Sequence, residues 1–132
     1  MKNARRPRRA GARGVTFEAM RRLALALPRV EEGTGYGTPA WRVAGRLFAR
    51  LREDGALVLR TDLDERQRLM SADPGAFYVT DHYVAYPWVL VRLPKVGRER
   101  LRALMKSAWQ RSAPKTLLAD TAPRARRTRT KA

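Results

Sequence analysis

The chain of 132 residues carries 29 basic and 12 acidic side chains, which gives a formal net charge of +17. It has no cysteine and one histidine, which excludes disulfides, thiolate metal sites, cysteine nucleophiles and a metal site of histidines alone. The length fits one domain, and no apolar run reaches the roughly 20 residues that a membrane-spanning helix needs. No apolar stretch follows the basic N-terminus as in a secretory signal, so we expect a cytoplasmic protein with no membrane contact, compatible with association with the nucleoid.

The charge is concentrated at the two ends of the chain. Residues 1–14 and 115–132 together hold 11 of the 17 net charges. Both ends are rich in Pro, Gly, Ala, Thr and Arg, so residues 1–14 and 119–132 are predicted to be disordered tails. Basic arms of this kind are typical of proteins that neutralise phosphates of a polyanion, although they could also serve solubility alone. The tail residues assigned to this contact are Arg5, Arg6, Arg8, Arg9, Arg124, Arg126, Arg127 and Arg129.

The first element expected after the N-terminal tail is a helix that ends before Pro28. Thr16 is a suitable N-cap residue, and Glu18 lies in the first turn, where the helix dipole favours an acidic side chain. Apolar residues then recur at helical spacing from Phe17 to Leu27.

Three strands are predicted next, over residues 36–44, 47–52 and 56–60. A turn at residues 44–46 separates the first two, and the pair Asp54-Gly55 is typical of a hairpin between the second and third. Strands joined by such short turns form an antiparallel meander.

The second half of the chain predicts a helix over residues 62–71, strands over 77–80 and 88–93, and a last helix over 97–112. The predicted order is therefore α-β(3)-α-β(2)-α. Three helices cover one face of such a sheet, so the expected fold is an α+β two-layer sandwich with an antiparallel sheet whose other face is partly open.

The open face of this sheet is the candidate binding surface. Side chains alternate between the two faces of a strand, and the wholly aliphatic sides are expected to face the helices. The arginines of the strands then share the open face with Phe48 and Trp88. One basic residue in a turn and another after the last strand extend this basic surface. The residues assigned to this surface are Arg42, Arg46, Arg50, Arg52, Arg60, Arg92 and Lys95.

Such a surface favours nucleic acid, because guanidinium groups bind phosphates and flat rings stack on unpaired bases. The alternative is ordinary alternation of polar and apolar residues in a chain where Arg outnumbers Lys 24 to 5.

No catalytic constellation is complete. Asp81 could orient His82 as a general base, but no nucleophile motif accompanies the pair. The adjacent acids Glu31-Glu32 and Glu53-Asp54 are expected in loops. The glycines at 33, 35 and 37 are expected to serve turns, since the lysine of a phosphate-binding loop is missing. We therefore expect no enzyme, no metal and no cofactor. A small-molecule pocket near Tyr36, His82 and Tyr83 is the least favoured hypothesis.

Three segments carry a resemblance to a known family: VEEGTGYGTPAWRVAGRLFARL, DGALVLR and ADPGAFYVTDHYVAYPWVLVRL. Over residues 16–118 they resemble the MmcQ/YjbR family, whose members are described as DNA-binding proteins. The shared spacing is that of Tyr36, Gly37, Pro39, Trp41, Gly45, Phe48, Tyr83, Trp88 and Val89. The resemblance implies one domain over residues 15–118, a fold similar to that of secretion chaperones, and a double-wing arrangement towards DNA. It implies no catalytic residues, and the long basic tails depart from the family pattern.

Two functions remain open. The first is a small DNA-binding protein, mainly without sequence specificity, that contacts phosphates through the tails, the strand arginines and the basic last helix with Arg98, Arg100, Arg102, Lys106 and Arg111. The alternative is a protein-interaction module, as the similarity to chaperones allows, whose charge is incidental.

Overall fold

The computed structural model describes residues 14–120, and the two predicted tails otherwise lie outside these residues. The helices are α2 (Phe17–Leu25), α3 (Leu63–Ala72), α4 (Arg98–Ser112) and α5 (Lys115–Asp120), and a 3₁₀ turn spans Leu93–Lys95. The strands are β1 (Val30–Gly35), β2 (Thr38–Val43), β3 (Arg46–Leu51), β4 (Leu57–Arg60), β5 (Phe77–Tyr78) and β6 (Trp88–Val91).

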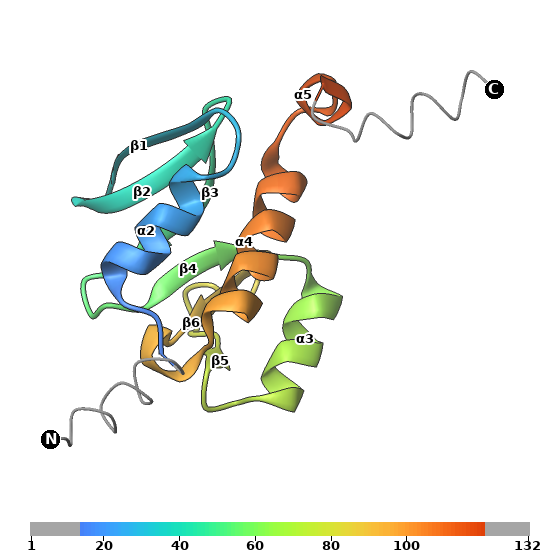
Figure 1. The fold of residues 1–132 in the computed structure, drawn as a ribbon. Coiled ribbons are helices and arrows are strands. Elements are labelled where there is room, and N and C mark those ends of the chain that lie inside the picture. Colours follow the sequence, from blue (N-terminus) through green and yellow to red (C-terminus); the bar gives the residue numbers. More distant parts are fainter. Residues whose placement is uncertain (1–13, 121–132) are drawn as a thin grey trace, which may run out of the picture.

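The strands form one sheet in the order β1-β2-β3-β4-β6-β5, and every neighbouring pair is antiparallel. Helices α2 and α4 lie against one face of this sheet, in front of it in Figure 1, and α3 lies beside β5 and β6. The main core fills the space between helices and sheet, with Trp41, Phe48, Leu59, Leu101 and Met105 almost fully buried. The predicted α+β fold with an antiparallel sheet is confirmed.

Local sequence signals explain where the helices begin. The hydroxyl of Thr16 accepts a hydrogen bond from the backbone N–H of Ala19 at 3.1 Å, and a carboxylate oxygen of Asp62 accepts one from Glu65 at 2.7 Å. Both side chains satisfy N–H groups that the first helical turn leaves without a partner. The predicted N-cap of α2 is therefore confirmed, and Asp62 caps α3 in the same way.

Strand β1 was not predicted. The sequence predicts a loop around Glu31 and Glu32, but β1 pairs with β2 along its whole length, from Val30 opposite Val43 to Gly35 opposite Thr38. Its residues are mostly exposed, so they lack the alternation of buried and exposed side chains that predicts a strand. The pairing is set by the turn, because Tyr36 and Gly37 both have positive φ angles, as a two-residue hairpin turn requires.

A β-bulge in β3 breaks the alternation on which the predicted open face depends. Trp41 pairs with Ala49, but the next residue of β2, Arg42, pairs with Leu47, so Phe48 is the extra residue of β3. Phe48 consequently belongs to the main core on the helix side. The prediction that Phe48 lies on the open face is wrong for this reason.

The C-terminal end also differs from the prediction. Helix α5 follows Pro114, where the sequence predicts that helical structure ends, and it includes Ala119 and Asp120, which were assigned to the tail. Proline is favoured at the start of a helix as well as after its end, so the same residue fits both interpretations. Across residues 14–120, every helix is too short or too polar to span a membrane.

Candidate nucleic-acid interface

Four arginines lie on the sheet surface opposite the helices: Arg42, Arg50, Arg60 and Arg92. We call this surface the arginine face. Strand pairing explains why they share it. Arg50 pairs with Val58, and Val58 with Leu90, while Arg60 pairs with Trp88. Val58 and Leu90 form a second, small core with Ala56, separate from the main one. The predicted convergence is therefore observed for these four arginines.

Arg50 is the most buried of the four, with an exposed fraction of 6%. One of its terminal nitrogens donates to the hydroxyl of Thr38 at 2.8 Å, and the other donates to the hydroxyl of Tyr83 at 3.0 Å. The guanidinium also lies 5.1 Å from the centre of the Tyr36 ring. Arg50 therefore lies on the predicted face, but its charge is covered by protein groups rather than presented to solvent.

One glycine of β1, Gly35, makes room for an arginine of a nearby strand. A Cβ on Gly35 would lie 3.2 Å from the Arg50 side chain and 3.6 Å from a terminal nitrogen of Arg42. Arg42 donates to the carbonyl of Thr34 at 3.2 Å. Gly35, which was expected to serve a turn, thus lies within β1 and lets the Arg50 side chain lie across the strand.

The other two arginines stack on aromatic rings of the same face. Arg92 lies 4.0 Å from the centre of the Tyr78 ring and donates to the carbonyl of Gly75 at 3.2 Å. Arg60 lies 5.8 Å from the centre of the Trp88 ring, and its Nε is buried with no hydrogen-bond partner in the part of the chain that the structure describes. Trp88 therefore lies beside an arginine as predicted.

The connection between β5 and β6 borders this face, and Arg66 of α3 holds it in place. The two terminal nitrogens of Arg66 donate to four backbone carbonyls, at distances of 2.8 to 3.3 Å. These carbonyls belong to Tyr83, Val84, Tyr86 and Trp88. No sequence pattern predicts this role, since Arg66 resembles any polar residue of an exposed helix face. The connection places the Tyr83 hydroxyl against Arg50.

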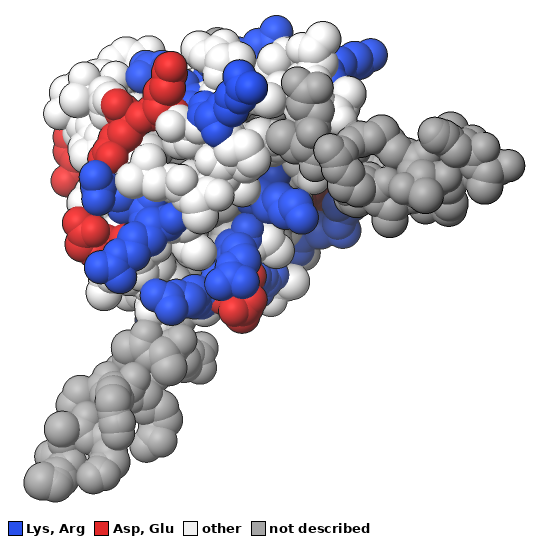
Figure 2. All heavy atoms as spheres, turned by 45° about the horizontal axis from the view of Figure 1, so that its top comes forward, with Lys and Arg blue, Asp and Glu red and all other residues white. Residues whose placement is uncertain are grey.

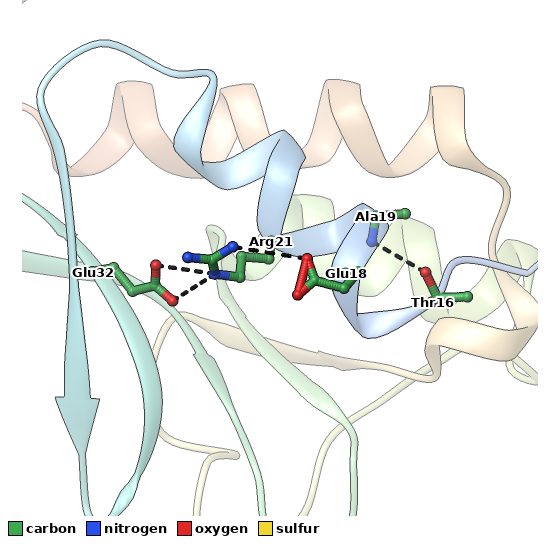
Figure 3. Close-up of polar contacts among 5 residues, drawn as sticks. All are labelled: Thr16, Glu18, Ala19, Arg21 and Glu32. Carbon is green, nitrogen blue, oxygen red and sulfur yellow. Dashed lines mark hydrogen bonds and ion pairs between the residues drawn. The ribbon is translucent and has the colours of Figure 1, made fainter.

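Four of the eight arginines on the helices form ion pairs within residues 14–120, unlike the arginines of the arginine face. Figure 2, viewed from the helix side, shows acidic side chains beside basic ones. Arg21 of α2 donates to the Glu32 carboxylate of β1 at 2.8 Å and lies 3.7 Å from Glu18, as Figure 3 shows. The hydrogen bond to Glu32 raises the pKa of Arg21.

Arginines of the last helix, α4, also form ion pairs with carboxylates. Arg111 pairs with both Asp62 and Glu65, and the other pairs of α4 are Arg100 with Asp73 and Arg102 with Glu99. Three of the five basic residues predicted to line a nucleic-acid backbone thus form ion pairs with carboxylates. By contrast, none of the four residues of the arginine face forms an ion pair within residues 14–120.

Of the other three predicted site residues in the domain, only Arg46 lies on the helix side. Arg46 is a correction: the bulge pairs it with Val43, and its guanidinium donates to the Ser112 carbonyl of α4 at 3.4 Å, on the helix side. Arg52 follows β3 and forms an ion pair of 3.7 Å with Asp54, so it does not extend the arginine face as a free cation. Lys95 is exposed and lines a pocket together with Asp54, Tyr78 and Arg92.

The tail residues of the predicted site, Arg5, Arg6, Arg8, Arg9, Arg124, Arg126, Arg127 and Arg129, lie outside the described residues.

The candidates for catalysis do not assemble. His82 is exposed and its ring contacts that of Tyr83 edge-on, at 4.7 Å between centres, while no hydrogen bond to Asp81 exists among the described residues. Within residues 14–120, no three acidic or histidine side chains come close enough together to hold a metal ion.

Fold and surface together define a small α+β protein with helices on one side of an antiparallel sheet and arginines with aromatic rings on the other. The YjbR family matches residues 25–111, and the chain belongs to this family. The resemblance noted in the sequence is thus confirmed.

The chain is similar to curated proteins and to a solved structure. Uncharacterised proteins of Mycobacterium tuberculosis (Rv2570) and Mycobacterium bovis (Mb2600) are 40% identical to the chain over 50 residues, so the chain spans 39% of the length of these relatives. The crystal structure of Deinococcus radiodurans protein DR2400, with a DUF419 domain, is similar with a TM-score of 0.64 and 22% identity, over 86% of each chain. At this identity the likeness concerns the fold alone.

Proposed function

We propose that the protein is a small DNA-binding protein that contacts the phosphate backbone without reading the base sequence. The observation that carries this proposal is the separation of its arginines into two groups. Four of the eight arginines on the helices are neutralised by carboxylates, whereas the four of the arginine face have no ionic partner among the described residues. Cations held without a carboxylate are suited to an anion supplied from outside the protein.

The net charge of +17 supports a polyanion as that partner, because a basic surface raises the local concentration of nucleic acid by long-range attraction. Phosphate contacts of this kind give affinity but carry no sequence information. Glu31 faces Arg42 across the pairing of β1 and β2 without forming an ion pair, so its carboxylate reduces the potential at that end of the face.

The proposal is tested by salt titration of binding to a fluorescent DNA duplex, measured by anisotropy. Each phosphate contact contributes about 0.9 to the slope of log affinity against log salt, so Arg42→Gln with Arg92→Gln should lower the slope by about 1.8. The matched control is Arg100→Gln with Arg102→Gln, which removes the same charge from exposed positions of α4 whose side chains already pair with carboxylates. Equal slopes for the two double variants would contradict a role of the arginine face, and a wild-type protein that binds neither duplex nor single-stranded DNA at low salt would contradict DNA binding altogether.

The alternative function, a protein-interaction module, is favoured by one observation. Val84 and Tyr86, in the connection between β5 and β6, have exposed fractions of 52% and 56%. Binding of a protein partner that is lost in Val84→Ser with Tyr86→Ser, but is insensitive to salt and to Arg42→Gln, would support this function over the first.

A further inference from the structure

Tyr36 stands out among the exposed side chains. It lies at the tip of the hairpin between β1 and β2 with an exposed fraction of 87%, the largest among the large hydrophobic side chains of the described residues. Its φ angle is +57°, and that of Gly37 is +84°. Turns of this type prefer Asn, Asp or Gly, because an ordinary side chain is strained in the left-handed region. An aromatic ring here adds strain to the turn and buries little surface in return.

The Tyr36 ring is supported on one side by an arginine of β3. The guanidinium of Arg50 lies 5.1 Å from its centre, and Arg50 is itself fixed by the hydroxyls of Thr38 and Tyr83. One side of the ring therefore rests on a rigid cation, while most of its surface faces solvent. A ring fixed in this way loses little conformational freedom when a second flat group stacks on it.

We propose that Tyr36 is a stacking platform for an unpaired nucleobase, so that the protein prefers single-stranded to duplex nucleic acid. This inference rests on the proposed function, of which it specifies the ligand. The bases of a duplex are covered by their neighbours, whereas every base of a single strand offers a free face. The arginine face supplies the second requirement, a positively charged surface for the backbone of the same strand, through Arg42, Arg60 and Arg92.

Aromatic rings recur along this surface and support a strand rather than a single nucleotide. Trp88 and Tyr78 lie under Arg60 and Arg92, on the strands at the far side of the sheet from β1. Charge complementarity favours nucleic acid over an apolar protein segment, because a burial of these arginines by apolar groups would leave their charges unpaired.

The test compares the binding of a fluorescent oligothymidylate and of a fluorescent duplex by the full chain and three variants. Tyr36→Asn removes the ring and places a residue that the turn prefers. Tyr36→Phe keeps the ring. Ala44→Asn is the matched control, because Ala44 and Gly45 form the same kind of turn between β2 and β3, with φ angles of +52° and +79°.

Loss of one stacked base should weaken single-strand binding roughly 5- to 150-fold in Tyr36→Asn and duplex binding less than about twofold. Tyr36→Phe should stay within about threefold of the wild type, since the ring faces are kept, and Ala44→Asn should equal it. The slope against log salt should be the same in all four proteins, because no phosphate contact is removed. Circular dichroism of each variant confirms that the fold is retained.

Cross-linking gives a second, independent readout. An oligonucleotide with 5-iodouracil, irradiated in complex with the full chain, should attach to Tyr36 in mass spectra of the digested protein, because photochemical coupling needs a stacked ring. Duplex binding equal to or tighter than single-strand binding, or equal losses for both in Tyr36→Asn, would overturn the inference and leave the proposed function standing. Absence of binding to both ligands would overturn both.

Discussion

Arg50 is a buried cation whose neighbours are hydroxyls, carbonyls and a ring rather than a carboxylate. A buried charge is costly unless hydrogen bonds replace the water that it loses. Here those bonds join three separate segments: the β1–β2 turn, strand β3 and the connection before β6. Arg50 is therefore expected to contribute to stability and to the shape of the arginine face, more than to phosphate contact.

The Tyr83 hydroxyl provides a specific test of this role. Tyr83→Phe leaves a buried N–H of Arg50 without its partner at 3.0 Å, so the free energy of unfolding should fall by about 1–3 kcal/mol. Urea unfolding measures this difference. The control is Tyr78→Phe, which keeps the ring under Arg92 and removes a hydroxyl without a hydrogen bond in the described part of the chain. Equal stability of Tyr83→Phe and wild type would show that water satisfies Arg50.

At the same scale, side-chain alternation predicted most of the arginine face correctly. It failed for Phe48, because this residue is the bulge of β3, and Arg46, expected in a turn beside the face, pairs with Val43 on the helix side instead. A bulge depends on how two strands fit together, so neither strand shows it in its own sequence. The contact of Arg50 with Tyr83 could not be predicted either, since it joins residues 33 positions apart.

Among the elements, helix α3 depends on the carboxylate that begins it. The backbone N–H of Glu65 and the guanidinium of Arg111 lower the pKa of Asp62 below its ordinary value of 3.8. Because the pKa is lower in the folded state, Asp62 stabilises the fold above the unfolded pKa, and this contribution is lost as the pH falls through the folded value.

Asp62→Asn retains a capping side chain but cannot ionise. Its free energy of unfolding should fall below that of the wild type at neutral pH, and the gap should close as the pH falls below about 3.8. Urea unfolding at a series of pH values measures the gap. A gap that is constant down to the lowest pH would contradict the ionic contribution.

The connection between β5 and β6 depends on α3 as well, through the four hydrogen bonds of Arg66. Arg66→Gln should speed amide hydrogen exchange in residues 80–88. A local opening of this connection then costs less free energy, because the hydrogen bonds of Arg66 no longer have to be broken. The exchange of β3 and β4 should stay unchanged. Arg68→Gln, two positions further along the same helix and exposed, is the control and should leave the exchange of residues 80–88 as in the wild type.

Elements with a strong local signal were predicted and those without one were not. Thr16, Asp62 and the Asp54-Gly55 turn fix the positions of two helices and a hairpin through contacts between near neighbours in the chain. Strand β1 has glycines and adjacent acids, and its structure follows from pairing with β2 rather than from its own preferences.

For the whole molecule, the charge has two distinct locations, the domain and the tails. Changing Arg5, Arg6, Arg8 and Arg9 to Gln should lower the salt slope of DNA binding by up to about 3.6 if each contacts a phosphate. Changing four exposed basic residues of the helix side, Arg22, Arg98, Lys106 and Lys115, removes the same charge and should lower it less. A tail variant with an unchanged slope would place DNA binding in the folded domain alone.

The edges of the sheet have a consequence for how copies of the protein behave when crowded. A free edge strand can pair with the same strand of another copy and begin aggregation. One edge, β5, has only two residues, and the other, β1, carries the adjacent carboxylates of Glu31 and Glu32. Two β1 edges would bring these like charges together. Glu32 is already paired with Arg21, so we expect Glu31 to disfavour the pairing of two β1 edges, also where several copies bind one polyanion as proposed.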